Sequence, residues 1–235
     1  MSENPDKVPF FLHPKPHAEI LRRHRVHWVQ KSFQLSAGLA ILLYFLSVLV
    51  QVYAINYATE SASNSVTDII LSNTPVFDVA WLFVYGMFAF AGFIAFLCIT
   101  HPKRIPFTLY SLTLFTLIRS VFVSLTHLSP FPVQTVIDFG TAITRMFFGG
   151  DLFFSGHTGA PFLMALLFWR EKGLRYLFLV WSVFFATIVL LGHLHYSIDV
   201  LSAYFITYTI YCVAKWAFPK ARALFESDSP FQEKR

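Results

Sequence analysis

Two short segments of the sequence place histidine among residues that could do chemistry. The segment at 150–159 reads GDLFFSGHTG and contains His157, and the segment at 193–199 reads HLHYSID. Because His195 and Asp199 are four residues apart, a helix would bring them to one face. The carboxylate would then fix one ring nitrogen and leave the other with its lone pair. Such an imidazole can attack phosphorus, and His157 could protonate the departing alkoxide. The two segments therefore predict phosphoryl transfer through a phosphohistidine.

Further residues near these segments could bind the phosphate group of a substrate. Ser155 and Gly156 stand at the expected start of a helix, where backbone N–H groups and the positive end of the helix dipole attract anions. Arg119, in the third apolar run, offers a planar fork of donors suited to phosphate oxygens. Asp151 and Tyr196 belong to the two histidine segments and complete the predicted substrate-binding set.

A metal site is the competing chemical interpretation of the same residues. His157, His193, His195 and Asp199 could supply ligands for zinc or iron. The sequence lacks the histidine-rich boxes that a membrane di-iron enzyme needs, and a phosphohistidine mechanism leaves His193 optional. We therefore expect neither a metal nor another cofactor. Taken singly, each motif also fits a packing histidine, a helix cap or a hydrogen bond at a helix mouth.

The composition indicates that membrane helices must position these residues. Of the 235 residues, 56% are hydrophobic and 13% are charged, against about 25% charged in an ordinary soluble domain. The mean hydropathy of +0.57 agrees. This composition excludes a disordered chain, a nucleic-acid-binding module and a typical cytosolic enzyme. Cys98 and Cys212 both lie in apolar runs, so the sequence predicts neither a disulfide framework nor a thiolate metal site.

Six apolar runs are long enough to cross a bilayer core about 30 Å thick, which needs roughly 20 residues per helix. The expected fold is an all-α polytopic membrane protein with six transmembrane helices, at approximately 33–57, 76–100, 105–126, 151–169, 174–192 and 196–218. The predicted organisation is an N-terminal arm at 1–32, a catalytic membrane domain at 33–218 and a tail at 219–235. The arm has no apolar run of the kind that a removable signal peptide requires.

The basic residues predict how the helices are oriented. All Lys and Arg residues except Arg119 and Arg145 fall in the arm, in the loops after the second and fourth runs, or from Lys215 onward. Because cytoplasmic loops keep positive charge, both termini are expected in the cytoplasm. The histidine segments and Arg119 then share the opposite face. The active site is therefore expected on the periplasmic, luminal or extracellular side of the membrane.

The two histidine segments closely resemble the two catalytic motifs of the sphingomyelin synthase family. That family is a branch of the lipid phosphatase and phosphotransferase superfamily typified by type 2 phosphatidic acid phosphatases. The resemblance extends upstream to PVFD at 75–78 and to the stretch at 119–130. It implies that His157, His195 and Asp199 form a catalytic triad. It also implies transfer of a phosphocholine, phosphoethanolamine or phosphoinositol head group from a glycerophospholipid to ceramide or a diacylglycerol-like acceptor, with release of diacylglycerol and without a metal.

The sequence also departs from both branches of that superfamily. Phosphatases carry an arginine just upstream of the second histidine, whereas the residues before His195, ATIVLLG at 186–192, contain none. This difference favours a phosphodiester substrate over a more highly charged phosphomonoester. Synthases carry an N-terminal interaction domain, and the arm at 1–32 is too short to fold one. Two alternatives stay open, a lipid phosphate phosphatase and a non-catalytic lipid-binding membrane protein, and an oligomer is compatible with each hypothesis.

Overall fold

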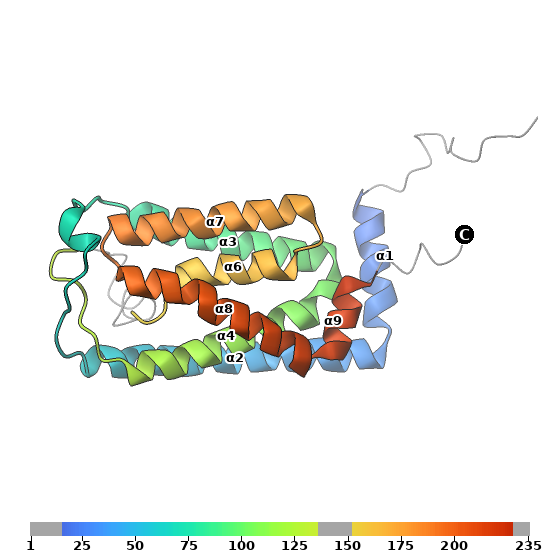
Figure 1. Ribbon diagram of the computed structural model, residues 1–235. Coiled ribbons are helices and arrows are strands. Elements are labelled where there is room, and N and C mark those ends of the chain that lie inside the picture. The colour runs from blue at the N-terminus through green and yellow to red at the C-terminus, as the bar shows by residue number, and fades with distance from the viewer. Residues whose placement is uncertain (1–15, 136–151, 228–235) are drawn as a thin grey trace, which may run out of the picture.

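A computed structural model describes residues 16–135 and 152–227, and every regular element in these ranges is a helix. Figure 1 shows the long helices alongside one another, with the short α1 across one end. Five helices in the described ranges are long and apolar enough to cross a membrane. They are α2 (Lys31–Glu60), α3 (Ala80–Thr100), α4 (Ile105–Leu125), α7 (Lys172–Leu191) and α8 (Ser197–Ala217). Each lies within a few residues of a predicted run, which confirms the all-helical membrane fold.

Helices α2 and α4 make the most extensive helix-to-helix contact of the described residues, and α2 buries small side chains. On α2 the alanines Ala37, Ala40, Ala54 and Ala58 are buried, while many of its large apolar side chains are exposed. Small residues let two backbones approach closely where the surrounding lipid offers no hydrophobic driving force between helices. In a bilayer, the exposed leucine and phenylalanine side chains of α2 would face the lipid chains.

The fourth predicted span differs from the observed helix. Instead of a helix over 151–169, the structure has α6 (Gly156–Leu167) of 12 residues, about 18 Å long. Ser155 caps its first turn, and residues 152–155 before it are not helical. Non-helical backbone at membrane depth is tolerated where protein surrounds it, and α6 is buried against α7 and α8. The described helix is therefore too short to span the bilayer by itself.

Two short helices outside the predicted spans lie at the same end of the bundle (Figure 1). They are α1 (Pro16–Trp28) and α9 (Pro219–Glu226), and both contact the short 3-10 helix η3 (Pro102–Arg104). The arm and the tail thus contain helices that the hydropathy pattern does not predict. We call this end, with α1, η3 and α9, the basic end. Its placement in the cytoplasm stays a prediction from the charge distribution.

A buried arginine and a neutral histidine connect the elements of the basic end. Arg104 Nη2 lies 2.8 and 2.9 Å from the two carboxylate oxygens of Glu171, and Arg104 is buried. Burial and the positive charges of Arg104, Arg23 and Lys103 lower the pKa of His101 to about 4. The His101 ring is therefore neutral near pH 7, and its Nε2 accepts a hydrogen bond of 2.6 Å from Arg23 Nη1.

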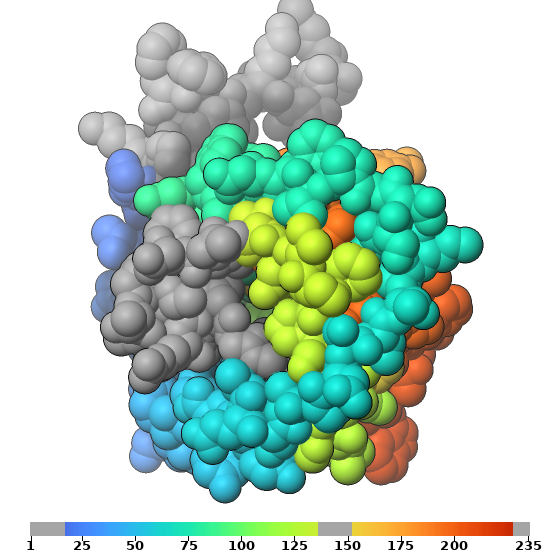
Figure 2. All heavy atoms as spheres, turned by 90° about the vertical axis from the view of Figure 1, so that its left-hand side faces the viewer, coloured from blue at the N-terminus to red at the C-terminus, as the bar shows by residue number. Residues whose placement is uncertain are grey.

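The opposite end of the bundle is covered by two loops, 61–79 and 126–135, which we call the loop end. The first loop contains the 3-10 helix η2 (Leu71–Asn73). The backbone N–H of Ser63 donates to the carbonyl of His127 at 2.8 Å, so the two loops lie side by side. Figure 2 shows this end, where the blue-green first loop borders the yellow-green second loop. The described residues of both histidine segments lie near this end of the bundle.

Candidate active site

The His195 side chain is held in one tautomer by a backbone carbonyl. Its Nδ1 lies 2.9 Å from the carbonyl oxygen of Leu152, and the side chain is buried. Because a carbonyl only accepts hydrogen bonds, Nδ1 must carry the proton and donate it. The second ring nitrogen, Nε2, then keeps its lone pair. His195 thus has the protonation pattern that a nucleophilic imidazole requires.

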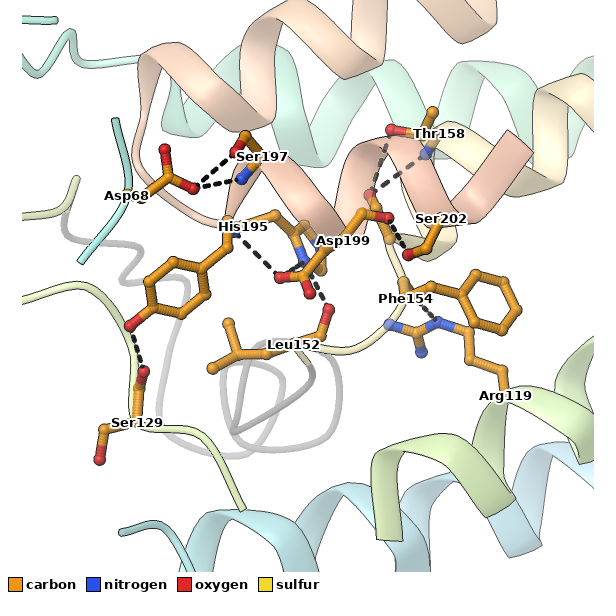
Figure 3. A network of polar contacts seen from close by, with 12 residues as sticks. Asp68, Arg119, Ser129, Leu152, Phe154, Thr158, His195, Ser197, Asp199 and Ser202 are labelled. Atoms are coloured by element: carbon orange, nitrogen blue, oxygen red, sulfur yellow. Dashed lines mark hydrogen bonds and ion pairs between the residues drawn. The ribbon is translucent and has the colours of Figure 1, made fainter. Parts of the chain in front are cut away.

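Asp199 lies beside this imidazole in the first turn of α8, as the four-residue spacing predicts. Its Oδ2 is 3.5 Å from His195 Nδ1 and accepts a hydrogen bond of 2.9 Å from the backbone N–H of Tyr196. Asp199 Oδ1 is buried and has no hydrogen-bond partner among the described residues. A buried carboxylate at this distance stabilises positive charge on the ring. The shorter hydrogen bond of His195 Nδ1, however, is the one that it donates to the Leu152 carbonyl, a partner that no sequence motif indicates (Figure 3).

Asp68, an acidic loop residue to which the sequence pattern assigns no role, completes the first turn of α8 from the loop end. Its Oδ2 accepts hydrogen bonds from the Ser197 N–H at 2.7 Å and from Ser197 Oγ at 2.8 Å (Figure 3). Its Oδ1 accepts from the N–H groups of Ile70 and Leu71. Burial alone would raise the pKa of this carboxyl, but the four hydrogen bonds outweigh it and hold the pKa below its usual value. A negative charge at a helix N-terminus is also favoured by the helix dipole.

Tyr196 connects the start of α8 to both loops of the loop end. Its hydroxyl donates to the carbonyl of Ser129 at 2.8 Å and accepts from the N–H of Val66 at 3.3 Å. Burial raises the pKa of the Tyr196 phenol, so the hydroxyl keeps its proton for the bond to Ser129. Tyr196 belongs to the substrate-binding set that the sequence predicts, whereas in the structure its hydroxyl is engaged in these two bonds. Asp151, from the same predicted set, lies outside the described residues.

The start of α6 is joined to the start of α8. The Ser155 N–H donates to the carbonyl of Asp199 at 3.1 Å. Ser155 Oγ caps α6 by accepting from the Thr158 N–H at 3.4 Å and from Thr158 Oγ1 at 3.2 Å. The hydroxyl and N–H of Ser155 are thus used within the protein. No acceptor for the next two N–H groups, those of Gly156 and His157, is found in the described part of the chain.

Arg119 reaches the start of α6 from α4. Its Nε donates to the carbonyl of Phe154 at 2.8 Å (Figure 3). A guanidinium has only donors, so the nearby amide of Gln51 must turn its oxygen toward Arg119, where it accepts from Nη1 at 2.8 Å. A Cβ on Gly156 would lie 3.0 Å from Arg119 Nε. Glycine at this position therefore lets the guanidinium lie directly against the helix start.

His157 lies in the first turn of α6, between two aromatic rings. It stacks on Phe83 with ring centroids 3.8 Å apart and meets the edge of Phe185 at 5.6 Å. His157 and Arg119 line the same cavity, and the N–H of Ser155, two residues before His157, donates to the Asp199 carbonyl. The structure thus brings the two predicted histidines, Asp199 and Arg119 to one region of the bundle.

The arrangement of the predicted metal ligands His157, His193, His195 and Asp199 tests the alternative of a metal site. Within the described ranges, His, Cys, Asp and Glu side chains form no group of three or more that could hold a metal ion. Instead, His193 Nδ1 lies 2.9 Å from the carbonyl of Val133 in the loop end. The neighbours of His195 Nδ1 are oxygen atoms of the protein itself.

The sequence from 149 to 217 matches the PAP2 superfamily C-terminal domain. This segment contains α6, α7 and α8, and with them His157, His195 and Asp199. The match supports the type 2 phosphatidic acid phosphatase superfamily, whose members generally act on phosphate esters of lipids, and it does not distinguish the sphingomyelin synthase branch. No curated protein and no solved structure matches the chain.

Proposed function

We propose that this protein is a membrane phosphotransferase that moves a phospho-head-group from a glycerophospholipid to ceramide or a related lipid alcohol. The observation that carries the proposal is the hydrogen bond from His195 Nδ1 to the Leu152 carbonyl, because it leaves Nε2 with a lone pair. The PAP2 match supports a lipid phosphatase or phosphotransferase in general. The choice of transfer rests on the charge of the site and on the motif resemblance.

In the first step, His195 Nε2 attacks the phosphorus atom of the donor lipid. The bond between phosphorus and the diacylglycerol oxygen breaks, and His157 gives that oxygen a proton, so diacylglycerol leaves as a neutral alcohol. The head group stays on His195 as a phosphohistidine. The Asp199 carboxylate, 3.5 Å from Nδ1, stabilises the positive charge that develops on the ring.

In the second step, the acceptor lipid replaces diacylglycerol. His157, now without its proton, takes the proton of the acceptor hydroxyl, and the acceptor oxygen attacks phosphorus. The bond between phosphorus and His195 Nε2 breaks, which restores both histidines for the next cycle. Water that reached the intermediate would release the free phospho-head-group. The surrounding apolar side chains keep water scarce and thus favour transfer over hydrolysis.

The charge of the site favours a phosphodiester. Arg119 is the one Lys or Arg side chain that lines the cavity beside His157 in the described part of the chain. A phosphodiester carries one negative charge, whereas a phosphomonoester near neutral pH carries between one and two. The one positive charge of Arg119 therefore matches the charge of a phosphodiester, although a phosphatase acting on phosphatidic acid is equally compatible with the PAP2 match.

A product assay separates these activities. The purified protein would be placed in liposomes with labelled ceramide and, in separate samples, phosphatidylcholine, phosphatidylethanolamine, phosphatidylinositol or phosphatidic acid. We expect a labelled phosphosphingolipid and an equal amount of diacylglycerol from one of the first three donors. Free phosphate from phosphatidic acid, with no labelled phosphosphingolipid, would establish the phosphatase instead. An adduct that is lost in acid and mapped to His195 would identify the phosphohistidine.

A further inference from the structure

An apolar cavity of about 530 Å³ leads from the candidate active site toward the basic end. His157 and Arg119 line it at one end, and Cys98 and Ile105 line it at the other. The lining residues run from Val84 to Cys98 on α3 and from Ile105 to Arg119 on α4. At 1.5 Å per residue, both helices give a length of about 21 Å. The cavity is therefore long and narrow, with its polar groups gathered mainly at the end where the chemistry is proposed.

The volume of the cavity decides how many lipid chains it can hold. One methylene group fills about 30 Å³, close to the share of one water molecule in the liquid. A cavity of 530 Å³ therefore holds roughly 18 methylenes at that packing. This is one long hydrocarbon chain, whereas glycerophospholipids and ceramides have two.

The cavity is open along one side of α3, where the second chain could remain in the bilayer. Phe88, Ala91 and Ala95 line the cavity and are also exposed at the surface of the bundle. These positions share one face of α3, because they are separated by three and four residues. The small side chains of the two alanines leave a passage through which a chain can move sideways between lipid and cavity.

We propose that this cavity binds one hydrocarbon chain of a lipid substrate, and that Cys98 and Ile105 set the longest chain that fits. The proposal rests on the proposed function for the position of the phosphate beside Arg119 and His157. Helix α4 is about 30 Å long, which equals the thickness of the bilayer core, so a chain filling 21 Å of it passes the membrane midplane.

In this arrangement, the preferred chain length depends on how well the hydrocarbon chain fills the cavity, and the hydrophobic effect contributes little to it. A chain that leaves the bilayer for the cavity moves from one apolar environment to another, so added methylenes gain little from the hydrophobic effect. A chain that is too short leaves empty space, and one that is too long meets the side chains of Cys98 and Ile105, and both cost free energy. The protein should therefore show a chain-length optimum that its own side chains set.

Photolabelling tests whether a chain occupies the cavity, independently of turnover. Vesicles would contain the full-length protein and phosphatidylcholine with a diazirine at the end of one chain, and labelled residues would be mapped by mass spectrometry. We expect labels around Cys98 and Ile105. Ala91→Trp, which blocks the opening, should reduce this labelling about tenfold. Ala89→Trp is the matched control, because Ala89 is exposed on α3 but does not line the cavity.

The length limit is tested by filling the end of the cavity that Cys98 and Ile105 line. Cys98→Trp should shift the optimum to chains several carbons shorter, in turnover of phosphatidylcholines with chains of different lengths. Cys212→Trp is the control, since Cys212 lies near the same end of the bundle, on α8, and does not line the cavity. Circular dichroism would verify that both variants are folded.

The outcomes separate this inference from the proposed function. Labelling around Cys98 that Ala91→Trp removes, without turnover of any phospholipid, would support the cavity and refute the transferase. Turnover with the same chain-length profile in Cys98→Trp and wild type would refute the length limit. Labels spread over the lipid-facing surface, equal in the Ala91→Trp and Ala89→Trp variants, would refute chain binding in the cavity.

Discussion

Helices α6 and α8 both begin at the candidate active site, but their first turns are completed in different ways. At α8, the carboxylates of Asp68 and Asp199 accept from the backbone N–H groups of Ser197 and Tyr196. At α6, the Ser155 hydroxyl caps the helix, and the described residues provide no acceptor for the next two N–H groups. We call the first turn of α8, where two carboxylates accept these bonds, the closed start, and the first turn of α6, where the described residues leave two N–H groups without an acceptor, the open start.

In the proposed mechanism, the two helix starts have different roles. The closed start fixes the backbone next to His195, so the imidazole and Asp199 keep their relative positions. The open start adds the positive end of the α6 dipole to the guanidinium of Arg119, which lies against Gly156. We infer that α8 positions the nucleophile and that α6 binds the phosphate. The following predictions test that division.

The largest effect is expected at the nucleophile beside the closed start. His195→Gln keeps a side chain that can donate to the Leu152 carbonyl but removes the reactive nitrogen, so turnover should fall at least about 10⁴-fold. Product formation in liposomes measures this. Binding of phosphatidylcholine to the variant should persist, because the open start is intact. More than a tenth of the wild-type rate would exclude His195 as the nucleophile.

The next effect concerns the proton donor at the open start. His157→Gln should lower kcat by about 10²- to 10⁴-fold, because the departing alkoxide would lack its acid. A donor lipid with an acidic leaving group, such as a nitrophenyl phosphodiester, needs no such acid. For that donor, we expect formation of the phosphohistidine to recover in His157→Gln but not in His195→Gln. Equal losses with both donors would contradict the assigned role of His157.

A smaller loss should follow from crowding the guanidinium at the open start. In Gly156→Ala the new Cβ would lie 3.0 Å from Arg119 Nε, so the guanidinium must shift by a few tenths of an ångström. We expect kcat/KM to fall about tenfold to hundredfold, since misplaced groups lose transition-state contacts. Gly92→Ala on α3 is the control, because its Cβ would meet nothing within 4 Å. Equal kinetics in both variants would show that Gly156 provides no needed space.

Weakening the closed start should have a modest effect on turnover. Asp68→Asn removes the charge that accepts from Ser197, and we expect kcat to fall about three- to tenfold with little change in KM. Asp68 acts through the position of His195 and not on the substrate. Asp78→Asn is a matched control, since among its described contacts Asp78 accepts only from the N–H of Ala80, two residues further along the chain at the start of α3. A rise in KM alone would place Asp68 in substrate binding instead.

The smallest effect is on stability in acid. Because the pKa of Asp68 is lowered by folding, its bonds stabilise the protein fully above about pH 3.9, the usual value, and are lost as the pH falls through the lowered pKa. Asp68→Asn should therefore lower the unfolding temperature at pH 7 and narrow its difference from wild type as the pH drops below about 4. Thermal unfolding in detergent across this range measures it. A difference in unfolding temperature between wild type and Asp68→Asn that widens as the pH falls would contradict a lowered pKa of Asp68.

Much of the fold follows from local patterns. The apolar runs identify α2, α3, α4, α7 and α8 to within a few residues, because a helix in lipid must satisfy its own backbone and be apolar over the bilayer core. The short α6 escapes this rule, since protein surrounds it and its flanking residues need not be helical. The helices α1 and α9 escape it as well, because polar sequences at the basic end gain stability from tertiary contacts that hydropathy does not register.

In the candidate site as well, some features follow from the sequence and others only from the structure. The pairing of His195 with Asp199 follows from their spacing on a helix. The Leu152 carbonyl leaves no mark in the sequence, because every residue has such a group. Asp68 lies 129 residues from Ser197, and only the folding of the loop end brings them together. An acidic residue in a loop of a membrane protein is the only signal that could have drawn attention to it.

The sequence by itself determined that this chain is helical and rich in helices apolar enough to cross a membrane, and it indicated which side chains to propose for phosphoryl transfer, because composition and short-range spacing are properties of the chain. Only the tertiary structure decided which carbonyl fixes the imidazole, which carboxylate closes α8, and that an apolar cavity runs from His157 and Arg119 toward the basic end. Contacts and cavities arise between segments far apart in the chain, and their geometry depends on how every helix packs against its neighbours.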